Sequence, residues 1–319
     1  MSVLVYTESE KGKFKKVAFE VASYAKAVAS QLGTSVTAIT INNDDSSSLS
    51  QYGVDKVLQV NDSQLDAFNA NTYANIIKQA AEKESSKVVI ISSSADSKYL
   101  APLLAVSLNA GYASNVVEAP SSTSPFTVKR TAFTNKAYNF TTINTDVKII
   151  GVSNNSFGLK ENVSTLSTEA FSPSIPSNGI HVDSVDKVTG KVTIADADIV
   201  VSAGRGLKGP ENWGMVEELA NVLGAATACS KPVSDLGWRP HSEHVGQTGK
   251  PVASNLYIAI GISGAIQHLA GINASKVKVV INTDPEAPFF KAADYGVVGD
   301  AFTVVPQLIE KLKAFKAQQ

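Results

Sequence analysis

The chain has 319 residues and only one cysteine, Cys229, so it can form no disulfide within itself. A single cysteine also leaves no cluster of thiols of the kind that holds structural zinc or an iron–sulfur centre. The histidine pair His241 and His244 stands between Pro240 and Gly246, which argues against a metal-binding helix there. We therefore expect no metal site, and the shortage of cysteine fits a reducing compartment.

Net charge and long apolar runs are also lacking. The formal charge is −1 and 18% of residues are charged, which gives no indication of a nucleic-acid partner. The longest apolar run, YIAIGISGAI, has about half of the ~20 residues that a membrane span needs and contains two glycines. The first residues show neither a signal-peptide nor a transit-peptide pattern. We expect no membrane span and a cytoplasmic location.

The length predicts two domains, because single hydrophobic cores stop growing near ~250–300 residues. Up to about residue 110, short β-branched runs alternate with stretches of helical periodicity, which predicts a parallel sheet with helices on both faces. The expected strands are 3–6, 36–41, 57–60 and 88–92, and the expected helices are 17–32 and 73–83.

Beyond Gly111, the segments 126–133, 137–143 and 147–152 are alternating or rich in β-formers, and we expect them to add antiparallel strands. The following segment is dense in Ser, Asn, Pro and Gly up to about residue 190. We place the domain boundary near its end, which gives domains 1–186 and 187–319.

The second domain restarts the alternation of strand and helix. Expected strands are 197–204, 225–229, 255–261 and 277–282, and expected helices are 210–224 and 306–315. The fold class is therefore α/β, with two doubly wound, mostly parallel sheets. Ligands of such sheets bind at the carboxyl ends of the strands, so those ends are the place to look for a site.

The strand that begins at 197 ends in GRGLKG (204–209), which fits the G-x-G-x-x-G pattern of dinucleotide sites. A nicotinamide site also needs an acidic residue at the end of the next strand, where this chain has Ser230 and Lys231. Asp235 follows only after a proline. A nicotinamide-dependent oxidoreductase therefore stays a weaker alternative, and Arg205 with Lys231 indicates a site for an anion.

The strand 255–261 runs into Gly-Ile-Ser-Gly-Ala (261–265) and a helix. The N–H groups of Gly264, Ala265 and Ile266, with the Ser263 hydroxyl, would suit a phosphate. The segment also comes close to the G-x-S-x-G pattern of serine hydrolases. That enzyme class needs an acidic residue and then a histidine after the serine. His268 is the last histidine and no acidic residue lies between it and Ser263, which argues against a serine hydrolase.

Three further segments meet this edge. Gln247 and Thr248 lie on a polar loop without helical or strand periodicity, where they suit the edge of a heterocycle. Taken singly, Asn282 would be a turn cap, Asp300 a turn residue before a strand, and His268 a core histidine with a satisfied hydrogen bond. Because the carboxyl ends of parallel strands lie at one edge of the sheet, we expect these segments to converge.

Read together, these segments resemble the α subunit of the electron-transfer flavoprotein. The motifs GRGLKGPENW, SKPVSDLGW, VGQTGK, GISGAIQHLAGI, INTDPEAPFF and ADYGVVGDAFTVVP follow in family order over essentially all of 199–306. The first half resembles the family in architecture only. The resemblance implies an electron carrier that is not an enzyme in its own right. It would hold FAD in the second domain and pair with a β subunit that packs against it and holds AMP.

The resemblance also implies the route of the electrons. Soluble flavin dehydrogenases, such as those that oxidise acyl-CoA in fatty acid β-oxidation, would be the donors, and a quinone oxidoreductase would be the acceptor. Thr248 would bond flavin N5, His268 would lie near the pyrimidine carbonyl, and the turn at Ser263 would hold the pyrophosphate. The implied FAD-binding residues are Arg205, Ser230, Lys231, Val245, Gly246, Gln247, Thr248, Ser263, Gly264, Ala265, Ile266, Gln267, His268, Asn282, Asp300 and Ala301.

One residue departs from the family pattern. Lys231 stands where the family usually has arginine, and a lysine can neither stack a planar guanidinium over a flavin nor donate bidentately. We therefore expect weaker stabilisation of the half-reduced flavin. Two alternatives stay open besides the nicotinamide enzyme: a bifurcating relative with a second FAD in place of AMP, and a partner subunit that has lost its cofactor.

Overall fold

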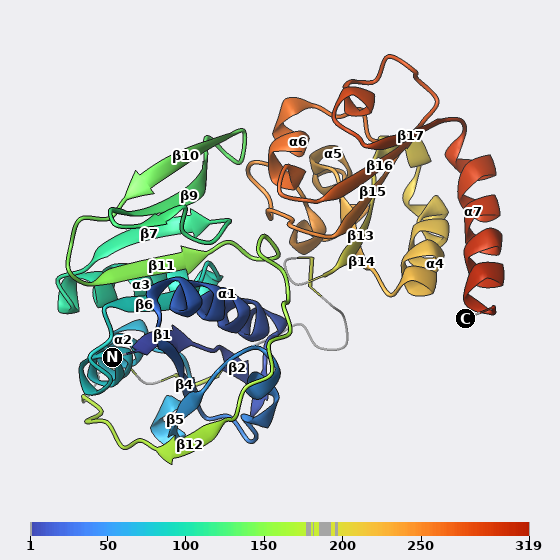
Figure 1. Ribbon diagram of the computed structural model, residues 1–319. Helices are drawn as coiled ribbons and strands as arrows, with labels where there is room; N and C mark the ends of the chain where they lie inside the picture. The colour runs from blue at the N-terminus through green and yellow to red at the C-terminus, as the bar shows by residue number, and fades with distance from the viewer. Residues whose placement is uncertain (1, 177–179, 181, 185–192, 195–196, 319) are drawn as a thin grey trace. The chain divides into compact units, whose positions relative to one another are not determined.

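The computed structural model describes residues 2–176, 180, 182–184, 193–194 and 197–318 (Figure 1). The chain divides into two compact units, one of Met1–Ala132 with Ala137–Val185 and the other of Phe133–Lys136 with Asp186–Gln319. The boundary predicted after residue 186 lies outside the described residues. Each unit contains a mostly parallel sheet with helices, so the predicted α/β class is confirmed.

The amino-terminal unit is built on a ten-stranded sheet with the order β10-β9-β7-β11-β6-β1-β4-β5-β12, to which β8 adds beside β9. Strands β1, β4, β5, β6, β7, β11 and β12 pair in parallel, and β8, β9 and β10 are antiparallel additions. The bounds are β1 (Ser2–Tyr6), β4 (Ser35–Ile41), β5 (Lys56–Val60), β6 (Val88–Ser92), β7 (Gly111–Val116), β8 (Ser122–Thr123), β9 (Phe126–Ala132), β10 (Ala137–Thr142), β11 (Lys148–Val152) and β12 (Ser167–Ala170); a separate ribbon pairs β2 (Ser9–Glu10) with β3 (Lys13–Phe14).

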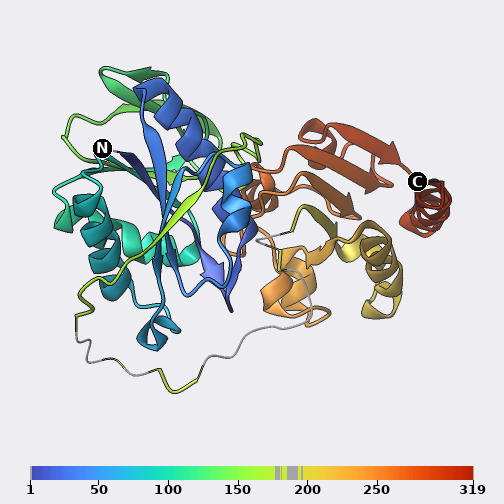
Figure 2. The ribbon, with the colours of Figure 1, turned by 60° about the horizontal axis from the view of Figure 1, so that its bottom comes forward.

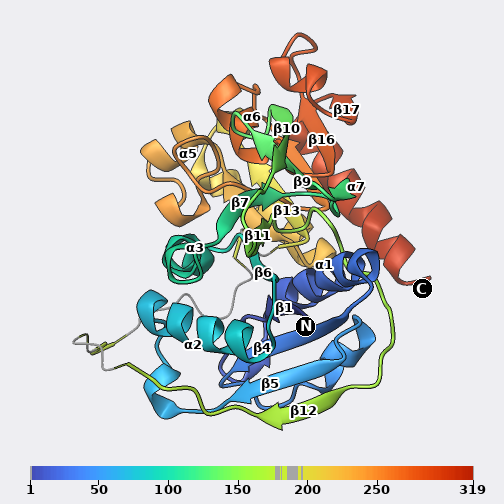
Figure 3. The same cartoon turned by 60° about the vertical axis from the view of Figure 1, so that its left-hand side comes forward.

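Helices cover both faces of this sheet, as Figure 3 shows for α1 and α2. Helix α1 (Lys16–Leu32) packs on one face, and α2 (Ala70–Lys83) and α3 (Ala95–Ser107) pack on the other. Strand β1 shows why its sequence is apolar throughout: Val3 and Val5 join the α1 side of the core, and Leu4 joins the opposite side. A strand that is buried on both faces has no polar alternation.

One strand prediction was wrong. Segment 147–152 was expected to be an antiparallel addition, but β11 pairs in parallel with both β6 and β7 inside the main sheet. Its neighbour β7 has the polar sequence GYASNV, which gives no strand signal, so the parallel partner was not recognised. The expected antiparallel character holds for β9 and β10, which form a hairpin at the sheet edge.

The carboxy-terminal unit has a five-stranded, all-parallel sheet with the order β14-β13-β15-β16-β17. Counted within the unit, this order is 2-1-3-4-5, the flavodoxin-like variant of the doubly wound sheet. Helices α4 and α7 lie together against one face (Figure 2), and α6 lies on the other. The bounds are β13 (Ile199–Ala203), α4 (Gly214–Leu223), β14 (Ala226–Cys229), α5 (Lys231–Asp235), β15 (Leu256–Ile260), α6 (Ile266–Ile272), β16 (Val277–Asn282), β17 (Tyr295–Val298) and α7 (Ala301–Lys316).

The four strands predicted in this unit are confirmed, and the predicted helix 210–224 is a 3₁₀ turn at Pro210–Asn212 followed by α4. Strand β17 and the start of α7 also differ from the prediction. Strand β17 was not predicted, because its four residues are all exposed at the sheet edge and show no alternation. Helix α7 begins at Ala301, not at residue 306, and carries Pro306 inside it. A proline is common at the first helical position, and this preference misplaced the start.

The position of β11 can be tested by amide hydrogen exchange. We expect the amides of β11 to exchange slowly, because the strand is paired on both sides, and those of β10 to exchange faster, because it pairs only with β9. Mass spectrometry of peptides covering 148–152 and 137–142 measures both. Equal exchange in the two peptides would contradict the observed strand order.

Candidate functional site

A cavity of about 560 Å³ lies at the carboxyl ends of the second sheet. The strand order reverses between β13 and β15, the position where ligands of doubly wound sheets bind. The lining comes from loops that follow β13, β14, β15 and β16: Arg205, Gly206, Ser230, Lys231, Pro232, His244, Val245, Gly246, Gln247, Thr248, Gly261, Ile262, Ser263, Ala265, Gln267, His268, Asn282, Asp284 and Ala287.

The structure brings all the predicted FAD-binding residues to this cavity except Gly264, Ile266, Asp300 and Ala301. Gly264 has φ 85° and packs its Cα against the backbone of Phe289, so it shapes the turn behind the lining. Ile266 is the first residue of α6, with its side chain 60% exposed. Asp300 and Ala301 start α7, where an Asp300 carboxylate oxygen accepts the N–H of Phe302 at 3.0 Å. Asp300 therefore precedes a helix and not a strand.

Glycines let the loops after β13 and β15 touch through their backbones. The N–H of Gly206 donates to the Gly261 carbonyl at 3.1 Å, and a Cβ on Gly206 would stand 2.6 Å from the Gly261 Cα. The second glycine of the G-x-G-x-x-G pattern thus serves contact between two loops, and its N–H is not free for a phosphate. This arrangement disfavours a dinucleotide fingerprint and leaves Arg205, exposed on the turn, as the charged group of this loop.

The turn before α6 offers backbone donors. Ala265 caps the helix, and its carbonyl accepts the N–H groups of His268 and Leu269. Among the described residues, none accepts a hydrogen bond from the N–H of Gly264, Ala265 or Ile266. Helix α6 has only seven residues, so an anion bound at this turn would be held by these N–H groups more than by a helix dipole.

The loop 244–250 is held at both ends. Val245 N–H donates to the Cys229 carbonyl at 3.0 Å, and Gln247 N–H donates to the Gln267 carbonyl at 2.8 Å. The backbone of Gly246 lies so close to α6 that a Cβ on Gly271 would stand 2.6 Å from the Gly246 nitrogen. The exposed Gln247 and Thr248 side chains are carried on a fixed loop that lines the cavity.

His268 lines the cavity and also bonds to the core. Its Nε2 lies 2.9 Å from the hydroxyl of Tyr257, which is fully buried in β15, and the residue is 6% exposed. Burial lowers the pKa of His268 to about 4, and the nearby His244 ring adds to the shift. The imidazole is therefore neutral at pH 7. His268 is therefore both a buried residue with a hydrogen bond to the core, as the first interpretation expected, and a residue that lines the cavity.

Sequence reasoning missed several lining residues. His244 is 2% exposed, its Nδ1 has no hydrogen-bond partner, and burial followed by the charge of His241 lowers its pKa. Its place directly before Val245 was the only signal in the sequence. The other missed residues are Gly206, Pro232, Gly261, Ile262, Asp284 and Ala287. Gly206 and Gly261 belong to motifs that the sequence had indicated, and the others are apolar or part of a turn and carry no local signal of a site.

Asn282 connects two of the loops. Its Nδ2 donates to the Ile262 carbonyl at 3.1 Å, and its Oδ1 accepts the N–H of Asp284 at 3.0 Å. The turn-cap interpretation is therefore correct, and the residue also lines the cavity. The cationic side chains at the rim are Arg205 and Lys231, and Lys231 is 62% exposed, 4.0 Å from Asp235.

Within the described residues, no three His, Cys, Asp or Glu side chains come together as metal ligands. In the same part of the chain, no helix combines the length and the apolar character of a membrane span.

Comparison with known proteins supplies the family. Residues 3–174 match the electron transfer flavoprotein domain, and residues 193–273 match the electron transfer flavoprotein FAD-binding domain. The electron transfer flavoprotein subunit alpha of Bacillus subtilis (strain 168) is 36% identical over 317 residues, which cover 98% of this chain and 97% of that protein. The chain belongs to the electron transfer flavoprotein α-subunit family.

Two other relatives show the spread of this α-subunit family. The electron transfer flavoprotein subunit alpha of Paracoccus denitrificans is 57% identical over 119 residues, which cover 37% of this chain and 39% of that protein. Protein FixB of Clostridium saccharobutylicum is 31% identical over 322 residues, which cover 98% of this chain and 96% of that protein.

The neutral state of His268 can be tested through the pH dependence of stability. Its folded pKa, about 4, lies below the ordinary value near ~6.5, so the unfolded chain binds more protons between these values. Stability should therefore fall as pH drops from about 6.5 to about 4. His268→Gln should reduce that loss by about 1–3 kcal/mol, measured by denaturant unfolding across this pH range. His241→Gln, which changes an exposed histidine in the same unit, is the control, and an equal effect of both variants would contradict the assignment.

Proposed function

We propose that this chain binds FAD in its carboxy-terminal unit and carries electrons as the α subunit of an electron-transfer flavoprotein heterodimer. The observation that carries the proposal is the cavity at the point where the strand order reverses, lined by twelve of the sixteen residues that the family resemblance implies. Its volume of about 560 Å³ lies in the range of cofactor sites. When bound, FAD supplies the capacity to take up and release electrons one at a time.

The residues fit a diphosphate and a heterocycle at different parts of the cavity. The donors at Gly264 to Ile266 and the Ser263 hydroxyl suit the diphosphate, with the Arg205 charge at the rim. Gln247 and Thr248 suit the polar edge of the flavin ring, because their amide and hydroxyl groups can both donate and accept. His268, held by Tyr257, presents a neutral imidazole in a fixed orientation.

Asp300 and Ala301 keep a proposed role in FAD binding although they do not line the cavity. They follow β17, which is parallel to β16, so they stand at the same edge of the sheet. The sixteen proposed residues would then act as one site. We include Lys231, whose exposed ammonium contributes positive charge without a planar stacking surface.

The remaining parts of the proposal follow from the family. The chain would pair with a β subunit that holds AMP, take electrons from soluble flavin dehydrogenases such as acyl-CoA dehydrogenases in the cytoplasm, and pass them to a quinone oxidoreductase. No substrate bond would be broken on this chain. Its residues would bind and orient the cofactor and set the polarity around it.

Neighbouring residues provide a matched test of the FAD site. Ala265 lines the cavity, whereas the neighbouring Ile266 offers the proposed site only its backbone N–H, and its exposed side chain does not line the cavity. We expect Ala265→Phe to fill the cavity and lower FAD content at least tenfold, and Ile266→Phe to leave FAD content within about twofold. Flavin released from the complex co-purified with its partner subunit is measured by absorbance. Full flavin content in Ala265→Phe would place the cofactor elsewhere.

The bifurcating alternative differs in the number of flavins, and the likeness to Protein FixB gives a reason to count them. The proposed carrier should release one FAD and one AMP per heterodimer. Two FAD and no AMP would establish the bifurcating form, and a colourless complex with turnover of a nicotinamide would contradict both.

Lys231 allows a test of charge at the rim. We expect Lys231→Arg to raise the first one-electron potential relative to the second by about 60 mV, because a guanidinium can lie flat against the ring. This shift is a tenfold change in the equilibrium constant that forms half-reduced flavin from its oxidised and fully reduced forms. Stepwise potentiometric titration of the flavin-loaded heterodimer measures both potentials. Lys208→Arg makes the same change at a lysine that does not line the cavity and is the control. Unchanged potentials in Lys231→Arg would refute the idea.

A further inference from the structure

The amino-terminal sheet has a reversal point of its own. The chain runs from β1 outward through β4 to β5 and then returns to β6 on the other side of β1. The carboxyl ends of β1, β6 and the next parallel strand, β11, therefore form the edge where a doubly wound sheet binds anionic ligands. In this unit the edge carries two buried glutamates, Glu8 and Glu20, which are 3% and 5% exposed.

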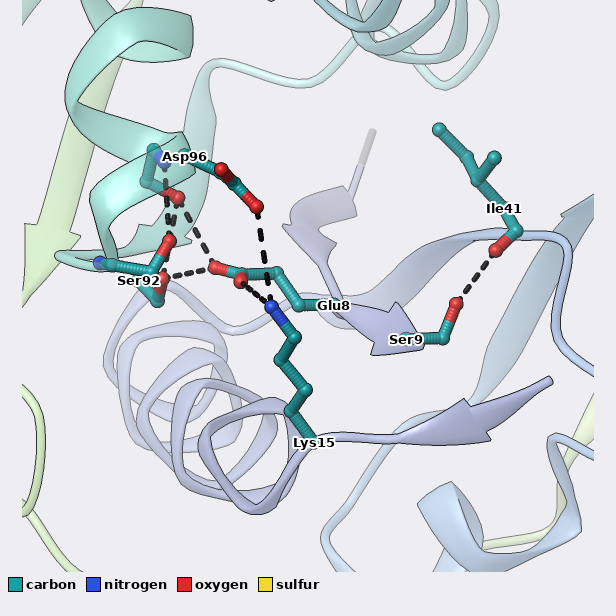
Figure 4. A network of polar contacts seen from close by, with 8 residues as sticks. Glu8, Ser9, Lys15, Ile41, Ser92 and Asp96 are labelled. Carbon is teal, nitrogen blue, oxygen red and sulfur yellow. Dashed lines mark hydrogen bonds and ion pairs between the residues drawn. The ribbon is translucent and has the colours of Figure 1, made fainter. Parts of the chain in front are cut away.

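Glu8 lies at this reversal point, and Figure 4 shows its contacts with Ser92 and Lys15. It follows β1, and one of its carboxylate oxygens accepts the hydroxyls of Ser92, at the end of β6, and of Ser97, in the first turn of α3. The Ser97 contact measures 3.2 Å. The other carboxylate oxygen lies 3.5 Å from the Lys15 ammonium, which also lies 3.9 Å from Asp96. Hydroxyl donors, a cation and a helix start thus surround a carboxylate of the chain.

Glu20 occupies a second anion position at this edge. It lies on α1 and accepts three backbone N–H groups from the turn after β11: Asn155 at 2.7 Å, Phe157 at 2.9 Å and Gly158 at 2.8 Å. Asn155 and Gly158 have φ of 56° and 78°, which turns successive N–H groups toward one point. Such a concave set of backbone donors is a phosphate-binding arrangement, here filled by a side chain from another element.

The two units therefore differ at corresponding edges. The carboxy-terminal edge is an open cavity with cationic side chains at its rim. At the amino-terminal edge, the hydroxyl and N–H groups that could bind an anion already donate to buried carboxylates of the chain. We propose that Glu8 and Glu20 are built-in substitutes for phosphate groups, which close this edge of the amino-terminal unit to a nucleotide. The inference does not depend on which cofactor the carboxy-terminal unit holds.

The test opens the turn and supplies inorganic phosphate as the probe. In the co-purified heterodimer, amide exchange of the peptide covering 153–160 is followed by mass spectrometry. Glu20→Ala should speed exchange of these amides about tenfold or more, because their acceptor is gone. Phosphate should then slow it again, saturably and by a similar factor, and chloride at matched ionic strength should not. Glu20→Gln is the isosteric control: its amide oxygen still fills the turn, so phosphate should have little effect.

Three results would overturn the proposal. The first is no effect of phosphate on exchange in a folded Glu20→Ala heterodimer. The second is equal slowing by phosphate in Glu20→Gln. The third is slower exchange of these amides in the unchanged protein with phosphate or AMP, which would show that a ligand displaces Glu20. If Glu20→Ala does not fold, Glu20→Ser, which also withdraws the carboxylate, takes its place with the same expected results.

Discussion

The close contact between backbones at the carboxyl ends of β13 and β15 is the constraint on which the site depends. Gly206 and Gly261 meet without a side chain between them, and Gly246 meets Gly271 in the same way. Because glycine has no Cβ, two loops and one helix can approach closely enough to form a cavity floor made of backbone. The polar side chains around that floor are then carried by fixed loops, so their orientation is largely set before a ligand binds.

Charge is distributed unequally over the two doubly wound units. In the carboxy-terminal unit the cations at Arg205 and Lys231 are exposed at the rim, and the buried histidines are neutral because burial lowers their pKa. In the amino-terminal unit the buried groups at the corresponding edge are carboxylates with hydroxyl, ammonium and backbone partners. One architecture thus supports an open anion site in one unit and a filled one in the other.

Sequence reasoning picked out twelve of the sixteen proposed FAD-binding residues that line one cavity, because glycines, hydroxyls and amides at strand ends are visible locally and parallel strands bring their ends together. It did not reveal Glu8 or Glu20, since their meaning depends on partners such as Ser97 and Gly158 that are distant in the chain. The placement of β11 failed for a similar reason, because strand pairing is a long-range property. His244 was missed because a buried histidine in a loop has no distinguishing neighbours in sequence.

The contact between Gly246 and Gly271 has a consequence for divergence among relatives. A side chain at position 271 would stand 2.6 Å from the Gly246 nitrogen, push the loop 244–250 away from α6 and disturb the hydrogen bond from Gln247 to Gln267. The cavity wall beside His268 would move with that loop, so glycine is expected to be kept at position 271. Substitutions that alter the surroundings of the cavity are therefore expected at Lys231 and at the exposed tips of the loops, where a side chain can change without moving the backbone.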